Sequence, residues 1–299
     1  MIRYIVKIKL IVFTVFFSAC VAEKKESLVI ADGAQLELID DFFAFTEGPA
    51  VDMVGNVFFT DQPNDQIWKW SAESGEISVF MEGCGRSNGL YFDKEGYLWA
   101  CADENNQLWK IDQNKGVQVM LKDYQEVLFN GPNDLWIDDE GGVYFTDPFY
   151  LRPYWKREAV SMINQAVYYL GKDGSLNTVE TGLKKPNGIV GSPDGQSLFI
   201  ADIGDNKTYK YTIHSTGALS DRKLFAPMGS DGMTIDRSGN LYLTGKGVSV
   251  FDSMGNLIEH IAVDAPWTAN VAFGGSSKNL LFITASNAVY TLKMKVKGN

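Results

Sequence analysis

Short apolar runs separated by turn residues fill the chain from residue 35 to residue 296. Each run is rich in Val, Ile, Phe, Tyr and Trp, and each is bounded by Gly, Asp, Asn or Ser. This is the pattern of β-strands joined by tight turns. No Pro/Ser linker or low-complexity tract interrupts the runs, so we predict a single all-β domain.

The runs repeat in six units, and each unit opens with a polar residue ahead of a strand. The six openings are EGPAV from Glu47, NGLYF from Asn88, NDLWI from Asn133, NGIVG from Asn187, DGMTI from Asp231 and NVAFG from Asn270. Second strands are predicted over 55–61, 96–102, 141–147, 195–202, 239–245 and 278–285. Third strands are predicted to begin at Gln66, Gln107, Ala166, Lys207, Gly247 and Ala288, and fourth strands at Ile77, Val117, Leu176, Arg222 and Leu257.

The spacing of these units predicts the architecture. The units recur at intervals of 39 to 54 residues, and four strands in a unit of this length are typical of a propeller blade. The sixth unit lacks a fourth strand, whereas a spare strand, QLELI from Gln35, precedes Glu47. We therefore predict a six-bladed β-propeller over residues 35–299, closed by this N-terminal strand, which removes exposed sheet edges. A β-sandwich or a solenoid is the alternative.

The first residues have the pattern of an export signal. Arg3, Lys7 and Lys9 precede an apolar run over 10–19, too short to span a membrane, and small residues lead to Cys20. This resembles a bacterial lipoprotein signal over 1–20, followed by a charged tether over 21–34. An ordinary secretory signal is the alternative. We expect an exported protein, periplasmic or anchored to the cell envelope by a lipid on Cys20, with no other membrane contact.

The charge and the cysteine content of the chain limit the kinds of binding partner and covalent cross-link that we expect. The chain has a net charge of −10, which becomes −13 without residues 1–19. This argues against nucleic acid, which needs basic patches, and it is compatible with cation binding by what we expect to be a monomer. Cys84 and Cys101 flank the first two strands of the second unit. In an exported protein they could form a disulfide or remain two buried thiols.

Several kinds of active site are absent from the sequence. The chain has two histidines, His214 and His260, and both lie far from the six opening residues. Without a Cys/His cluster, a zinc site of the usual kind is not expected. No GxSxG string and no phosphate-binding or dinucleotide fingerprint is present.

Oxygen ligands remain at the six opening positions. If the units form a ring, these six side chains point at one axis, where they offer the carboxylates of Glu47 and Asp231 and four amides. Calcium takes six to eight oxygen ligands of these kinds. A carboxylate facing the middle of a ring is costly unless it is paired or bound to a metal. The alternative for any single Asn is a turn or cap residue.

The longer strings are similar to a known family. TEGPA at 46–50, NGPNDLWIDDEGGVYFTDP at 130–148, KKPNGI at 184–189 and GSDGM at 229–233 resemble the senescence-marker-protein/gluconolactonase family, which includes regucalcin. The resemblance covers roughly 36–296. It implies a six-bladed propeller with one divalent cation on its axis, usually calcium, although magnesium, manganese or zinc could take its place.

The resemblance also implies roles for residues. Glu47, Asn187 and Asp231 would bind the metal directly. Asn133 would sit beside it, as a ligand or through water, and would contact the substrate. Asp231 would be the catalytic acid and base. Asn88 and Asn270 would line the channel or the surroundings of the ligands.

The family's usual reaction is hydrolysis of sugar lactones to aldonic acids, so we expect a metal-dependent lactonase acting on a small sugar lactone. A non-enzymatic propeller that binds sugar or calcium is the main alternative, and a hydrolase of other esters or organophosphates is a third.

The longest insertion, residues 148–165 of the third unit, could cover the substrate with Tyr150, Arg152, Tyr154 and Trp155, or it could be a packed rim loop. Many relatives carry a Glu-His-Gly-like string near 103–105. Here these positions hold Asp103, Glu104 and Asn105, which leaves the substrate open.

Overall fold

The computed structural model describes residues 1–2, 26–157, 159–160 and 162–299. Over these residues the chain forms 24 β-strands and two short 3-10 helices, Gln62–Asn64 and Asp103–Asn105. The predicted signal segment, including Cys20, lies outside the described residues apart from Met1 and Ile2. None of the described helices is long and apolar enough to cross a membrane.

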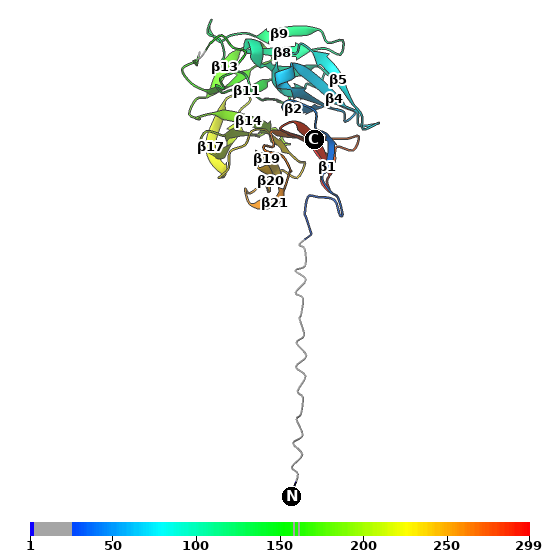
Figure 1. Ribbon diagram of the computed structural model, residues 1–299. Helices are drawn as coiled ribbons and strands as arrows, with labels where there is room; N and C mark the ends of the chain where they lie inside the picture. The colour runs from blue at the N-terminus through cyan, green and yellow to red at the C-terminus, as the bar shows by residue number, and fades with distance from the viewer. Residues whose placement is uncertain (3–25, 158, 161) are drawn as a thin grey trace.

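The strands form six four-stranded antiparallel sheets arranged as a ring (Figure 1). Blade one contains β2 (Thr46–Val51), β3 (Val57–Asp61), β4 (Gln66–Trp70) and β5 (Ile77–Glu82). Blade two contains β6 (Ser87–Phe92), β7 (Leu98–Ala102), β8 (Gln107–Ile111) and β9 (Val117–Leu121). Blade three contains β10 (Leu135–Ile137), β11 (Val143–Asp147), β12 (Ala166–Leu170) and β13 (Leu176–Glu180).

The second half of the ring has the same order. Blade four contains β14 (Pro186–Gly191), β15 (Ser197–Asp202), β16 (Lys207–Ile213) and β17 (Leu219–Ala226). Blade five contains β18 (Met233–Ile235), β19 (Leu241–Gly245), β20 (Gly247–Phe251) and β21 (Leu257–Ile261). Blade six contains β22 (Asn270–Gly274), β23 (Leu280–Ala285), β24 (Ala288–Lys293) and β1 (Glu37–Asp40). The predicted six-bladed propeller is confirmed.

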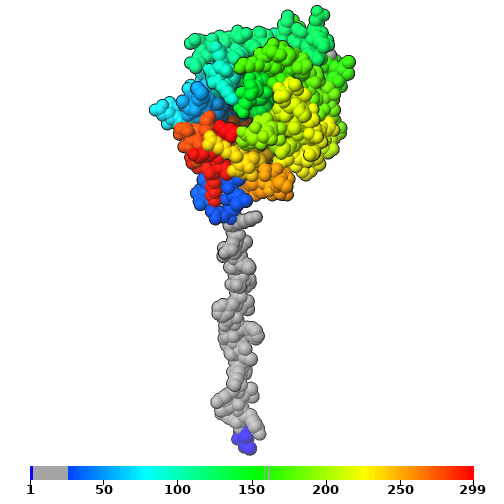
Figure 2. Space-filling model, turned by 180° about the vertical axis from the view of Figure 1, so that it is seen from behind, coloured from blue at the N-terminus to red at the C-terminus, as the bar shows by residue number. Residues whose placement is uncertain are grey.

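The N-terminal strand closes the ring. β1 pairs antiparallel with β24, with Glu37 opposite Thr291 and Leu38 opposite Tyr290. Seen from behind, the C-terminal residues (red) lie against the N-terminal segment (blue) (Figure 2). Val29 is buried and Ile30 forms a bridge with Met294, so this part of the segment predicted as a tether also packs on blade six.

The hydrophobic core lies between neighbouring blades. Phe58 of blade one and Phe92 of blade two meet with ring centroids 5.0 Å apart, and Phe59 meets Phe282 of blade six at 5.4 Å. Each blade alternates its apolar side chains between its two faces, so every face is covered by the next blade. Cys84 and Cys101 are both buried and free, which decides between the two predicted states of these thiols.

Candidate active site at the propeller axis

In four of the six units a glycine follows the opening residue, and it allows the inner strands to converge. A Cβ on Gly48 would lie 2.1 Å from the Asn88 carbonyl oxygen, and one on Gly232 would lie 1.9 Å from Cγ of Asn270. The backbone N–H of Gly232 donates to the carbonyl of Ala269 at 2.7 Å. Glycine is therefore required at these points, and the close approach brings the opening residues together at one end of the axis.

Two of these residues bring carboxylates to the axis. Glu47 is 5% exposed, and its Oε2 accepts the backbone N–H of Gly48 at 3.0 Å. Burial raises the pKa of Glu47 well above its ordinary value, and the carboxylate of Asp231 raises it further. Like charges in one buried place are unfavourable unless a proton or a cation is shared between them.

Asp231 is held by two side-chain donors. Asn187 Nδ2 donates to Oδ1 at 2.7 Å, and Trp267 Nε1 donates to Oδ2 at 2.6 Å. Burial raises the pKa of Asp231, whereas these two hydrogen bonds lower it. Trp267 precedes β22 in a segment without a repeated pattern, so sequence reasoning did not identify it.

The amides differ in which atom they leave free. Asn187 uses Nδ2 for Asp231 and for the Tyr150 hydroxyl at 2.9 Å, so its Oδ1 is available as a ligand. Asn270 uses Oδ1 to accept the N–H of Val271 at 2.8 Å. Its Nδ2 is left for the carboxylates of Glu47 and Asp134; burial raises the pKa of both, and the hydrogen bond from Asn270 offsets a small part of the rise. Asn270 is therefore a donor toward the site.

Asn88 and Asn133 are the least satisfied of the opening residues. They are 5% and 6% exposed, and within the described part of the chain no hydrogen bond is found for either side-chain amide. Neither side chain belongs to the fully enclosed polar atoms that lack a partner, so both amides stay open toward the axis. They are therefore suited to contact a ligand or a cation there.

Asp134 is a third axial carboxylate that sequence reasoning did not select. It stands where most units have the glycine that follows the opening residue. Asp134 is the one acid at this position, so the third unit alone brings a carboxylate to the axis here. It is 7% exposed, and burial raises its pKa to about 8. With Asn270 it lines an axial cavity of about 180 Å³. The departure from glycine was the available signal.

The donor set fits a hard cation. Within the described residues, no three His, Cys, Asp or Glu side chains come together as a metal-binding group. A cation here would therefore depend on two carboxylates, Glu47 and Asp231, together with amide oxygens such as Oδ1 of Asn187. Two negative charges and neutral oxygens match a divalent cation of the calcium type.

Of the four residues predicted to cover the substrate, Tyr150 contacts the axis and the other three contact Asp103 on blade two. The Tyr150 hydroxyl contacts Asn187 at the axis. Arg152, Tyr154 and Trp155 all hydrogen-bond to Asp103, through Nε at 2.7 Å, the hydroxyl at 2.6 Å and Nε1 at 3.0 Å. The charge of Arg152 also acts on Glu47 and Asp231. The loop is thus packed, and Tyr150 is its residue in contact with the axial amides.

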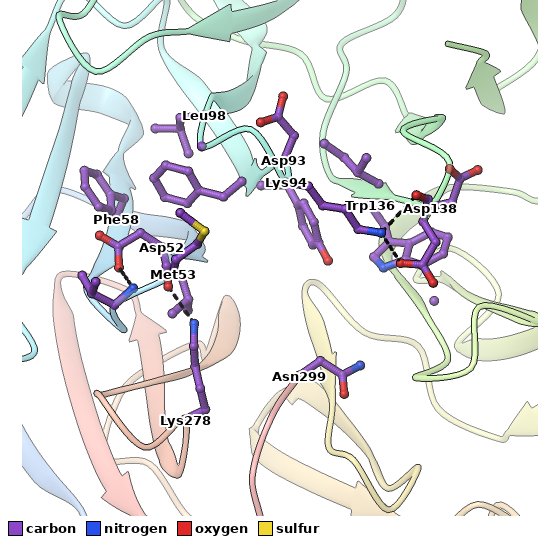
Figure 3. Close-up of a pocket in the computed structure, with 18 of the residues that line it drawn as sticks. Asp52, Met53, Phe58, Asp93, Lys94, Leu98, Trp136, Asp138, Lys278 and Asn299 are labelled. Atoms are coloured by element: carbon purple, nitrogen blue, oxygen red, sulfur yellow. Dashed lines mark hydrogen bonds and ion pairs between the residues drawn. The ribbon is translucent and has the colours of Figure 1, made fainter.

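A larger cavity of about 610 Å³ lies at the other end of the inner strands (Figure 3). Phe58, Leu98 and Trp136 line it, and two of its carboxylates, those of Asp52 and Asp139, already have partners within the protein. Asp52 accepts the backbone N–H groups of Val54 and Asn56, and Asp139 pairs with Lys94 at 2.7 Å. The axial end, with its unsatisfied amides, is therefore the better candidate for chemistry.

These features define a class: six-bladed propellers with oxygen donors gathered on the axis. The chain belongs to the SMP-30/gluconolactonase/LRE-like family, which matches residues 45–287, and this confirms the predicted resemblance.

Three relatives illustrate the match. A gluconolactonase of Zymomonas mobilis is 28% identical over 293 residues, 88% of this chain and 82% of that protein. The structure of a gluconolactonase from Xanthomonas campestris is 28% identical, with a TM-score of 0.83 and coverage of 89% and 91%. Regucalcin from Agrobacterium tumefaciens, a calcium-binding protein, shares the fold at 19% identity, with a TM-score of 0.75 and coverage of 89% and 96%.

Proposed function

We propose that this enzyme hydrolyses a small sugar lactone to the aldonic acid with the help of a divalent cation at the propeller axis. Calcium is the first candidate for this cation. The observation that carries the proposal is the pairing of Glu47 and Asp231 in one buried site beside amides that lack protein partners. The gluconolactonase relatives support the lactone as substrate.

Glu47, Asn187 and Asp231 would hold the cation, with Asn133 beside it as a further ligand or a substrate contact. A bound divalent cation would supply the positive charge that polarises the lactone carbonyl. The observed orientation of the Asn187 amide, with Nδ2 on Asp231, leaves Oδ1 free for this role.

Asp231 would act as the acid and base. Its carboxylate accepts a proton from the attacking water and returns it to the ring oxygen as the C–O bond of the lactone breaks. The hydrogen bonds from Asn187 and Trp267 keep the carboxylate oriented and favour its ionised form. Tyr150 and Asn88 would contact the sugar hydroxyls at the same end of the axis.

The test measures hydrolysis of glucono-, galactono- and related lactones in a pH-stat, above the spontaneous rate, by the unchanged protein, by two variants of the site and by one control variant. Asp231→Asn should lower kcat by about 10²–10⁴-fold, the usual contribution of an acid–base residue. Glu47→Gln should weaken cation binding at least about tenfold, measured by calorimetry, because a ligand charge is lost. Chelator should abolish turnover by the unchanged protein.

The control is Asp139→Asn, whose exposed carboxylate pairs with Lys94 at the other end of the inner strands. It should keep both the activity and the cation affinity. Cation binding without turnover of any lactone or ester would instead indicate a binding propeller, and full activity in chelator would contradict the metal requirement.

We also propose that the chain is exported and attached to the envelope through a lipid on Cys20, and that it acts as a monomer. The support is the basic start, the apolar run and the small residues before Cys20. The acidic charge of the chain fits a small-molecule substrate and a cation better than nucleic acid.

A further inference from the structure

The loop that leaves blade three over residues 148–157, called here the blade-three loop, is fixed to blade two through a single buried carboxylate. Asp103 is 2% exposed and follows β7 directly. Its Oδ2 accepts Arg152 Nε at 2.7 Å, the Tyr154 hydroxyl at 2.6 Å and Gln62 Nε2 of blade one at 3.1 Å. Its backbone carbonyl accepts Trp155 Nε1 at 3.0 Å.

The other end of the loop rests on blade four. The Tyr150 hydroxyl accepts Asn187 Nδ2 at 2.9 Å, and the Lys185 ammonium lies 4.4 Å from the centre of the Tyr150 ring. The loop therefore reaches from Asp103 on blade two to Asn187 on blade four. Between these two contacts it packs on blade three, where Trp155 lies beside Gly131.

Asp103 and the blade-three loop also pack on the chain segment that leads to Asn133. A Cβ on Gly131 would lie 2.8 Å from Asp103 Oδ1 and 3.0 Å from Cη2 of Trp155. The backbone N–H of Gly131 donates to Asp147 Oδ1 at 2.7 Å, and Gly131 stands two residues before Asn133. Asp103 and Trp155 thus pack directly on the segment that delivers Asn133.

Without the Asp103 charge, the blade-three loop would lose its ion pair through Arg152 and the charged acceptor of the Tyr154 hydroxyl. The side chain of Arg152 is 21% exposed, and its ion pair is with Asp103. Removing one partner of a largely buried pair leaves the other charge uncompensated, which is strongly unfavourable. The guanidinium and the Tyr154 hydroxyl can recover their hydrogen bonds only by moving the loop toward water.

We propose that Asp103 is a positioning residue that holds the blade-three loop over the site and so limits the substrate to small, monocyclic lactones. The inference rests on the proposed lactone hydrolysis. Tyr150 contacts the axial amide of Asn187, and the charge of Arg152 acts on Asp231, so a second sugar ring on the lactone would have to displace the loop that carries them.

The experiment uses the full chain and compares Asp103→Asn with Asp93→Asn. Asp93 is a matched control because it is also a buried carboxylate of blade two with an ion pair, Lys110 at 2.8 Å, but it lies at the other end of the inner strands. Tyr154→Phe removes a single hydrogen bond to Asp103 and serves if Asp103→Asn does not fold.

Limited trypsin digestion reads the position of the loop without any substrate. Cleavage after Lys156, which no proline follows, should be at least tenfold faster in Asp103→Asn than in Asp93→Asn, and faster in Tyr154→Phe by a smaller factor. Equal cleavage rates in the two Asp variants would overturn the role of Asp103.

The kinetic arm measures kcat/KM for gluconolactone and for the lactone of a disaccharide aldonic acid. In Asp103→Asn, the ratio should shift at least tenfold toward the larger lactone, mainly through KM, and a general loss of stability would not change this ratio. An unchanged ratio would overturn the size limit. If the unchanged protein hydrolyses no lactone, the proposed function fails, while faster trypsin cleavage would still support the fixing of the loop by Asp103.

Discussion

At the residue scale, the axial site is a balance between buried acids and the donors around them. Burial raises the cost of ionising both Glu47 and Asp231, and the charge of Asp231 adds to the cost for Glu47, while Asn187, Trp267 and Asn270 supply hydrogen bonds that offset part of it. Asp134 adds a third acid below them, with its pKa raised to about 8. Such an arrangement needs a bound proton or a bound cation to offset the buried negative charge at neutral pH.

Asp134→Asn tests the cost of burying this acid. The pKa of Asp134 is about 8 in the folded protein and returns to about 3.9 in the unfolded chain. Between these values the unfolded chain ionises while the folded protein keeps the proton, so the stability that this group contributes is lost as the pH rises. Asp134→Asn removes that loss. In chelator, its advantage in unfolding free energy should grow from pH 4 to pH 8 by up to about 1.4 kcal/mol per pH unit.

The measurement is urea unfolding of both proteins at each pH in the presence of chelator. The two curves should differ least near pH 4, where the carboxyl of the folded protein is protonated and that of the unfolded chain is only about half ionised. An advantage that does not change between pH 4 and pH 8 would show that Asp134 does not carry the proton in the folded protein.

At the element scale, the inner strands determine whether the site exists. Their openings combine a polar residue that faces the axis with a glycine that lets the neighbouring blade approach. Gly48 has φ +43° and packs against backbone atoms of blade two, which cannot move aside as a flexible side chain could. The same element therefore supplies both a proposed ligand and the close approach of the neighbouring blade.

Gly48→Ala should separate blades one and two at the axis. The new Cβ would lie 2.1 Å from the Asn88 carbonyl oxygen, so we expect a loss of more than about 4 kcal/mol in unfolding free energy, or failure to fold, as for other severe clashes. Gly174→Ala is the control, because Gly174 also has positive φ, +84°, but a Cβ there meets nothing within 4 Å. It should cost only about 1–2 kcal/mol.

Chemical denaturation measures both variants, and cation affinity by calorimetry reports whether the axis is intact. Similar losses in the two variants would mean that backbone strain, and not the close approach of the blades, accounts for the glycine at position 48.

At the scale of the whole molecule, the seam of the ring is also the point where the N-terminal segment arrives. β1 completes blade six, Ile30 bridges to Met294, and Lys295 pairs with Glu26 and Asp32. A lipid on Cys20 would therefore hold the protein by the seam, with few residues between the anchor and the packed chain.

Cys20→Ser should move the protein from the membrane fraction to the soluble fraction and abolish labelling by a radioactive fatty acid. The melting temperature should not change, since β1 begins only at Glu37. Cys84→Ser is the control for labelling, because Cys84 is buried within the propeller. Continued labelling of Cys20→Ser would contradict lipid attachment at this residue.

The sequence by itself determined the ring. Strand composition and turn residues are local properties, and their recurrence at a regular interval is enough to predict six blades, the closing strand and the residues that open each inner strand. The strand ends moved by a few residues, as for β17, which begins at Leu219 and not at the predicted Arg222. Only local hydrogen bonding decides such ends.

Only the tertiary structure decided which groups meet at the site. Trp267 reaches Asp231 across 36 positions of sequence, and Trp155 reaches Asp103 across 52, from loops without a repeated pattern. The same holds for the amide orientations of Asn187 and Asn270, which depend on the partner each side chain finds. Loops from different blades meet only after the ring has closed, so their contacts leave no periodic trace in the chain.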